Sequence, residues 1–183
     1  MEDLSSFIQD IVENSLNVQA ENIQLLITED TLQKTLLIEI IDDGIGMSEE
    51  TLQKVEDPFY TTRTTRKVGL GLSFFKQSVL QTEGKFKITS TLGEGTSVFA
   101  LYNTFHIDMP PVGDLSSTIQ TILAHPALKH FIYNHQIDDA NFRFDTEEVK
   151  NVLGVTSFND VTLLQDIKQY IQDLLDNIRG GKL

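Results

Sequence analysis

Two strand-like segments near the amino terminus constrain the fold most. The segments "NIQLLITED" (22–30) and "KTLLIEIIDD" (34–43) are rich in isoleucine and leucine, and the turn-forming residues "EDTLQ" lie between them. Apolar runs joined by a short turn are typical of neighbouring β-strands. The second strand runs directly into "DDGIGM" (42–47), so a turn with two glycines is expected where that strand ends.

The other amino-terminal segments predict three helices and a hairpin. Apolar residues from Leu4 to Leu16, with Ser15 on the same arc, indicate an amphipathic helix. A short helix is expected after Ser48, to about Val55, and a third from about Leu70 until Gly84 ends it. "KFKITST" and "TSVFALYN" alternate like strands around "LGEGT". This order predicts an α+β fold whose antiparallel or mixed sheet carries helices on one face.

A break in the pattern divides the chain into two expected units. "HIDMPPVGDLSS" has two prolines and a glycine, which marks a boundary near 105–113 between residues 1–105 and 106–183. The second unit is expected to be a small α+β appendage. Its predicted elements are a helix near 115–125, the strands "HFIYNHQ" and "NFRFDT", a helix at 146–153 and an amphipathic helix from about Asn159 to Ile178.

Charge and composition exclude several classes of function. The chain of 183 residues has a formal net charge of −13, which disfavours nonspecific binding to nucleic acid or anionic membranes. It has no cysteine, so disulfides, thiolate metal sites and a cysteine nucleophile are excluded. The acidic amino terminus predicts neither a signal peptide nor a membrane span. We therefore expect a soluble protein of the cytoplasm.

Polar residues gather at two places in this pattern. Asp10, Asn14 and Asn17 share a polar arc of the first helix, which an ordinary solvated face would also explain. At the end of the second strand, Asp42 can accept a hydrogen bond, and the following glycines permit backbone to approach a planar ligand. A turn without any ligand remains the alternative for this segment.

A basic cluster precedes the third helix. In "DPFYTTRTTRKVGLGL" (57–72), Arg63, Arg66 and Lys67 come just before two glycines at a helix start, where free backbone amides attract anions. Three cations beside such amides suit a triphosphate, although a plain join of loop and helix would show the same glycines. In "GEGTSVF", Thr96 begins a strand and can hydrogen-bond to the base edge that Asp42 would read. A tight hairpin turn is the alternative there.

The four segments together resemble one family. "DIVENSLNVQA", "DDGIGM", "DPFYTT…KVGLGL" and "GEGTSVFALY" look like the successive nucleotide-binding motifs of the ATPase superfamily that joins gyrase, Hsp90, histidine kinases and MutL, over about residues 4–103. The loop and "GLGL" look most like the histidine-kinase branch. The resemblance implies a two-layer α/β sandwich of the Bergerat type, a bound adenine nucleotide and a magnesium ion.

The resemblance also implies roles for individual residues. Asn14 resembles the magnesium ligand, and Asp42 resembles the carboxylate that reads the adenine amino group. The remaining nucleotide-binding positions it implies are Gly44, Gly46 and Met47 beneath the base, Arg63, Lys67, Gly69, Leu70, Gly71 and Leu72 at the phosphates, and Thr96 in the last motif. The segment 57–70 would form a lid over ATP.

Two departures from the family pattern bear on activity. The hydrolytic branches have a water-activating glutamate one turn before the asparagine, and here that position holds Asp10, which is shorter by one methylene. Asp10 is the candidate base by its position, but its shorter side chain argues against hydrolysis, and Glu13 would reach only from a differently turned helix. Only nine residues precede Asp10, so the hairpin with the phosphoacceptor histidine is not expected in this chain.

These observations predict an ATP-binding regulatory protein that acts on a protein partner, either as an anti-sigma-factor-like switch or as a kinase in trans. A slow ATPase and a scaffold without nucleotide are the alternatives. The four histidines all follow residue 105 and are expected to be ordinary surface or core residues, with His130 and His135 on opposite faces of a strand. The apolar stripe of the last helix would cover its own core or form a partner or homodimer surface.

Overall fold

The computed structural model describes residues 3–56 and 70–180. The part of the chain before residue 57 begins with a helix and a pair of strands. Its elements are α1 (Leu4–Asn17), β1 (Asn22–Asp30), β2 (Thr35–Asp42) and α2 (Glu49–Glu56). The segment after residue 69 continues with α3 (Leu70–Gln81), β3 (Lys85–Thr91), β4 (Gly95–Asn103) and α4 (Leu115–Leu123). The last four elements are β5 (His130–Ile137), β6 (Ala140–Asp145), α5 (Thr146–Leu153) and α6 (Val161–Ile178).

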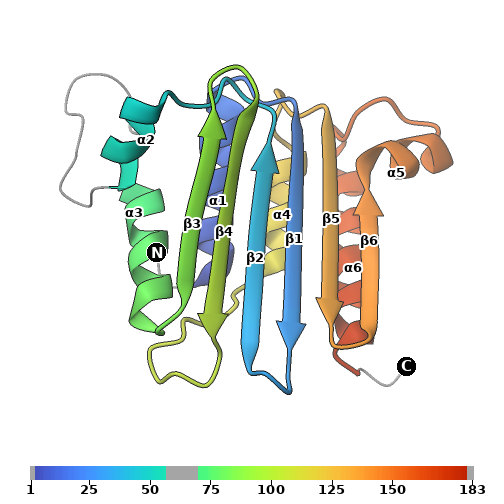
Figure 1. Ribbon diagram of the computed structural model, residues 1–183. Helices are drawn as coiled ribbons and strands as arrows, with labels where there is room; N and C mark the ends of the chain where they lie inside the picture. Colours follow the sequence, from blue (N-terminus) through green and yellow to red (C-terminus); the bar gives the residue numbers. More distant parts are fainter. Residues whose placement is uncertain (1–2, 57–69, 181–183) are drawn as a thin grey trace.

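The strands form one mixed sheet of six, in the order β3-β4-β2-β1-β5-β6. Every neighbouring pair is antiparallel except β1 and β5, which run parallel. Figure 1 shows α1, α4 and α6 together behind this sheet. The predicted α+β class, with a mixed sheet and helices on one face, is confirmed.

Helix α1 forms where the apolar arc predicted it. Asp3 caps its amino terminus and accepts a hydrogen bond from the backbone N–H of Ser6 at 2.8 Å. The buried face of the helix packs toward the sheet, with Ile8 and Val12 fully enclosed. Because this face is fixed against β2, the polar arc with Asp10 and Asn14 is turned toward the beginning of α3.

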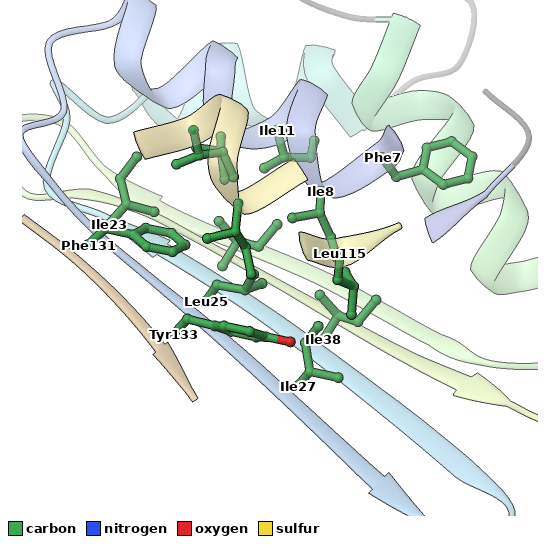
Figure 2. Close-up of a cluster of buried hydrophobic side chains, with 14 of the residues drawn as sticks. Phe7, Ile8, Ile11, Ile23, Leu25, Ile27, Ile38, Leu115, Phe131 and Tyr133 are labelled. Carbon is green, nitrogen blue, oxygen red and sulfur yellow. The ribbon is translucent and has the colours of Figure 1, made fainter. Parts of the chain in front are cut away.

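The two expected units share one sheet and one core. Strand β1 has two hydrogen-bonding edges; β2 occupies one, and β5 from the second unit occupies the other, with Asn22 opposite His130. In Figure 2 the side chains of Phe131 and Tyr133 from β5 lie in the same cluster as those of α1 and β1. The boundary segment itself lies against α1, since Leu4 N–H donates to the carbonyl of Pro111 at 2.9 Å.

The histidines of β5 face opposite sides of the sheet, as their spacing predicted. His135 is fully buried, and its ring nitrogens lie 2.6 Å from the Tyr133 hydroxyl and 2.8 Å from Glu29 Oε1. His130 Nε2 lies 2.9 Å from Asp145 Oδ1. Within the ranges described, no three histidine or acidic side chains are grouped so that they could hold a metal ion.

The last helix mainly covers its own core. Its buried residues Leu164, Ile167, Ile171 and Leu175 lie along one face, which contacts α4, β5 and β6. Among the helices described, none is long and apolar enough to cross a membrane.

Candidate functional site

A buried carboxylate marks the end of β2. Asp42 is only 9% exposed and lies on the face of the sheet that the helices cover. Its Oδ2 accepts a hydrogen bond from Ser15 Oγ at 2.6 Å, and its Oδ1 accepts one from the backbone N–H of Gly44 at 2.9 Å. These two donors offset part of the cost of burying the charge and fix the carboxylate in place. Each oxygen keeps a lone pair for a further donor.

Ser15 is a site residue that the sequence analysis assigned only to the apolar arc of α1. It is buried, and besides donating to Asp42 its hydroxyl lies 3.2 Å from the carbonyl of Ile11. The signal that could have identified it is its position, because a polar side chain inside a buried stripe requires a partner. Ser15 directly follows Asn14, so α1 presents two polar groups to this end of the sheet.

The turn after Asp42 is held closely against the rest of the molecule. Gly46 has a φ of +64°, and a Cβ there would lie 2.0 Å from the carbonyl oxygen of Thr91, so only glycine fits. A Cβ on Gly44 would lie 3.0 Å from Asp42 Oδ1. Met47 is fixed by its backbone N–H, which donates to Ser90 Oγ at 2.8 Å. The predicted glycine turn therefore packs against the β3–β4 hairpin.

Thr96 lies directly opposite Asp42 in the pairing of β2 with β4. Ser90 Oγ donates to the carbonyl of Gly95 at 2.9 Å and also lies 2.9 Å from Thr96 Oγ1. Either hydroxyl can be the donor between Ser90 and Thr96, and in both cases the oxygen of Thr96 keeps a lone pair for a molecule that binds beside Asp42.

The polar arc of α1 meets the first turn of α3. Asn14 Nδ2 donates to Asp10 Oδ2 at 3.3 Å, and a Cβ placed on Gly71 would lie 1.5 Å from that same oxygen. Burial raises the pKa of the Asp10 carboxyl, the nearby charge of Glu13 raises it further, and the Asn14 hydrogen bond opposes both. Glu13 is exposed and accepts from Gln9 Nε2 at 2.8 Å, so Asp10 faces α3 in its place.

The structure brings together only some of the predicted residues. Asp10, Asn14 and Gly71 meet between α1 and α3, and Asp42, Gly44, Gly46, Met47 and Thr96 meet at the strand ends. Leu72 packs against the core, and Asn17 is exposed at the end of α1. The predicted phosphate contacts Arg63, Lys67 and Gly69, and the neighbouring Arg66, lie outside the described residues, as does the side chain of Leu70.

Comparison with protein families gives one match over most of this region. A family described as histidine kinase-, DNA gyrase B-, and HSP90-like ATPases matches residues 2–109, which is more than half of the chain. This range contains every residue assigned above to the candidate site.

Individual relatives resemble the chain over different lengths. Sporulation kinase E of Bacillus subtilis (strain 168) is 34% identical over 101 residues, which are 55% of this chain and 13% of that protein. The peroxide stress-activated histidine kinase mak2 of Schizosaccharomyces pombe (strain 972 / ATCC 24843) is 29% identical over 165 residues, which are 79% of this chain and 6% of that protein. The chain thus spans a small fraction of the length of these relatives.

A solved structure shares the fold alone. The N-terminal domain of a DNA repair protein superposes with a TM-score of 0.51 at 16% sequence identity, covering 79% of this chain and 52% of that one. The superposed fraction extends beyond residues 2–109, so part of the carboxyl-terminal segment also has a counterpart in that structure.

Proposed function

Because this chain belongs to the family of histidine kinase-, DNA gyrase B-, and HSP90-like ATPases, we propose that it binds Mg-ATP beside α1 and acts on a protein partner. The family assignment makes it an ATP-binding domain of the histidine-kinase type, and its mixed sheet with helices on one face is the Bergerat-type fold. The role proposed for the nucleotide-bound form is regulatory: it acts as an anti-sigma-factor-like switch or as a kinase in trans.

The observation that carries the proposal is the buried Asp42 carboxylate. Burying a carboxylate to 9% exposure costs free energy unless hydrogen bonds compensate for the lost water, and here Ser15 and Gly44 donate to it and hold it in a fixed orientation. Thr96 supplies a second acceptor on the neighbouring strand. Asp42 can accept a hydrogen bond from the amino group of adenine, and Thr96 can accept one from a water molecule that bridges to the ring edge.

The residues on α1 fit a magnesium ion. Asn14 donates to Asp10 through its amide nitrogen, so its amide oxygen keeps the capacity to bind a cation. Magnesium prefers oxygen ligands and commonly binds through few protein groups together with phosphate oxygens and water. A bound ion would neutralise charge on the phosphates. Gly71 places the backbone of the first turn of α3 near the same point, where free N–H groups favour anions.

Asp42→Asn tests nucleotide binding most directly. The amide keeps one oxygen toward the Gly44 N–H and can face Ser15 with its NH₂, so we expect the fold to remain intact. Loss of the charged acceptor should weaken Mg-ATP binding by about 1.5–3 kcal/mol in titration calorimetry.

Asp43→Asn is the matched control. Asp43 is exposed and accepts hydrogen bonds from Glu21 and Asn22 rather than from any group of the site. The substitution Asp43→Asn therefore removes the same charge one residue away from Asp42. Equal affinity in the wild type and in Asp42→Asn, or equal loss in both variants, would contradict the proposal. No heat and no rise in melting temperature with millimolar Mg-ATP in the wild type would instead favour a scaffold without nucleotide.

A slow ATPase is the second candidate, and the position of Asp10 favours it. Asp10 is half-buried, its pKa is raised, and it lies beside Asn14 and the first turn of α3, where a general base would be needed. ADP release by the wild type and by Asp10→Asn separates the candidates. Turnover that disappears in Asp10→Asn indicates hydrolysis, whereas ATP binding without turnover in either protein indicates a switch.

A further inference from the structure

A second surface feature lies far from the candidate site, between α5 and α6. A cavity of about 520 Å³ opens there beside the edge strand β6. This size lies within the range of about 300–1,000 Å³ that is usual for ligand pockets. We call it the α5–α6 groove, and its apolar walls are formed by Val149, Val152, Leu153, Leu163, Ile167 and Tyr170. None of these residues belongs to the nucleotide site.

Three apolar side chains of the α5–α6 groove are at least half exposed. Val152 is 84% exposed, and Leu153 and Tyr170 are each about half exposed. Single exposed apolar residues are ordinary on protein surfaces, but a contiguous group around a cavity indicates a site of interaction. On α6 the wall residues Leu163, Ile167 and Tyr170 follow i, i+4 and i+7 spacing. Ile167 is buried in this row and Tyr170 is half exposed, so the row lines one side of the groove, where another helix can pack.

The rim of the groove is acidic. Glu148 and Asp166 line it, and the one cation among the lining residues, Arg143, is paired with Asp145 and Glu148. The sequences of α5 and α6 together contain five acidic residues and two lysines.

Both lysines are directed elsewhere. Lys150 Nζ donates to the carbonyl of Lys129 at 2.9 Å, and Lys168 Nζ lies 3.9 Å from Asp114 Oδ2. The electrostatic field at the groove is therefore negative, so it favours cationic partners.

We propose that the α5–α6 groove binds an amphipathic helix of a partner protein, with an apolar stripe that enters the groove and lysine or arginine residues that face its acidic rim. A helix laid in an apolar groove is a common mode of peptide recognition. A second copy of this chain is a poor occupant, because it has a net charge of −13 and the same acidic rim. This proposal stands apart from nucleotide binding, since the groove and the site share no residue.

A designed pair of peptides tests this assignment on the full chain. The first is a fluorescent 18-residue peptide of leucine and lysine with leucines at i, i+3, i+4 and i+7. The second has the same composition with its leucines spread around the helical wheel. Fluorescence anisotropy should show the first binding at least about tenfold more tightly, because only it presents an apolar stripe. Equal affinities would overturn the proposal, since charge alone would then explain binding.

Two variants of equal charge locate the peptide. Val152→Asp places a carboxylate in the groove wall, and Leu32→Asp places one on the β1–β2 turn, where Leu32 is 91% exposed. Both substitutions are at exposed positions, and urea unfolding will verify that the fold is kept. We expect Val152→Asp to weaken binding of the striped peptide about tenfold and Leu32→Asp to leave its affinity within about twofold of the wild type. Both variants add the same attraction for a cation, so the difference between them reports contact with the groove wall.

Amide chemical shifts provide a readout that is independent of affinity. Addition of the striped peptide should move the backbone resonances of α5 and α6, around Leu153 and Tyr170. Shifts confined to β6 would indicate pairing of an extended strand with the sheet edge and would overturn the helix assignment. Shifts elsewhere, or an unchanged affinity of Val152→Asp for the striped peptide, would overturn the assignment of the α5–α6 groove as the binding site.

Discussion

Asp10 and Gly71 are in direct contact although they belong to different helices. A Cβ on Gly71 would lie 1.5 Å from Asp10 Oδ2, and the obstacle is a short side chain that is itself half-buried. Gly71 lies in the first turn of α3 and has no need of an unusual backbone conformation. The requirement for glycine at this position therefore comes from the carboxylate of Asp10 and not from the helix.

A double-mutant cycle exposes this dependence. Gly71→Ala alone should lower the free energy of unfolding by about 1–3 kcal/mol, the usual cost of overpacking. In an Asp10→Ala background the obstacle is gone, and alanine gains up to about 1 kcal/mol over glycine in a helix, so the effect should vanish or change sign. Urea unfolding of the four proteins measures the coupling. Equal costs of Gly71→Ala in both backgrounds would show that another neighbour excludes the side chain.

At the scale of single residues, the motifs predicted the glycine turn and the carboxylate at the end of β2. Asp42 and Gly46 could be identified because each has a local reason to be there: a strand end and a positive φ. Ser15 could not be recognised as a partner of Asp42, because 27 positions separate them and only the packing of α1 on β2 brings them together. Contacts of this kind require the tertiary structure.

Individual elements were predicted well because their signals are local. Helix α5 (Thr146–Leu153) is capped by Asp145 before it and by Gly154, with φ +68°, after it, so adjacent residues indicate both of its boundaries. The order of strands has no such local signal. The parallel pairing of β1 with β5 joins segments that are more than one hundred positions apart, and neither strand's periodicity indicates its neighbour.

Helix α4 offers a pH test at the level of one element. Asp114 caps it, and hydrogen bonds from the Ser117 hydroxyl and the Ser117 backbone N–H are the main causes that lower the pKa of the Asp114 carboxyl to about 2. A lowered pKa means that the cap stabilises the fold above the unfolded value, about 3.9, and that this stabilisation is lost as the pH falls toward 2.

Asp114→Ala should cost about 1 kcal/mol of unfolding free energy at pH 7, as other lost amino-terminal caps do. The difference from the wild type should shrink as the pH falls from about 5 toward 2, because the carboxyl of the unfolded chain takes up a proton near pH 3.9 while the folded carboxyl, with its pKa of about 2, stays ionised until lower pH. Asp114→Asn provides the control, since asparagine also caps helices and does not titrate. Urea unfolding at several pH values measures both variants, and a difference that stays constant as the pH falls would contradict the assigned role.

For the whole molecule, the shared sheet determines how the chain can be divided. Strands β1 and β2 hold the centre of the sheet, and β5 and β6 extend it on one side. Buried side chains of β5 lie in the same cluster as Ile23 and Leu25 of β1. A chain cut at residue 105 would keep the motifs of the nucleotide site but would expose one edge of β1 and part of this cluster.

We therefore expect residues 1–105 alone to lose cooperative unfolding. Circular dichroism against urea should show a broad transition, because the remaining core buries too little apolar surface to offset the conformational entropy. Addition of a separate fragment of residues 106–183 should restore a sharp transition. A cooperative transition of 1–105 with the midpoint of the full chain would show that the first unit folds independently, as the sequence boundary suggested.

The parallel pairing of β1 with β5 also affects the timing of synthesis. Asn22 finds its partner at His130, so one side of β1 stays unpaired on the ribosome until the polypeptide has grown past β5. Distant pairings form slowly, and an apolar strand that waits for its neighbour is prone to association with other nascent chains. We therefore expect the yield of correctly assembled protein to depend on the translation speed between these two segments and on how well β1 is shielded during that interval.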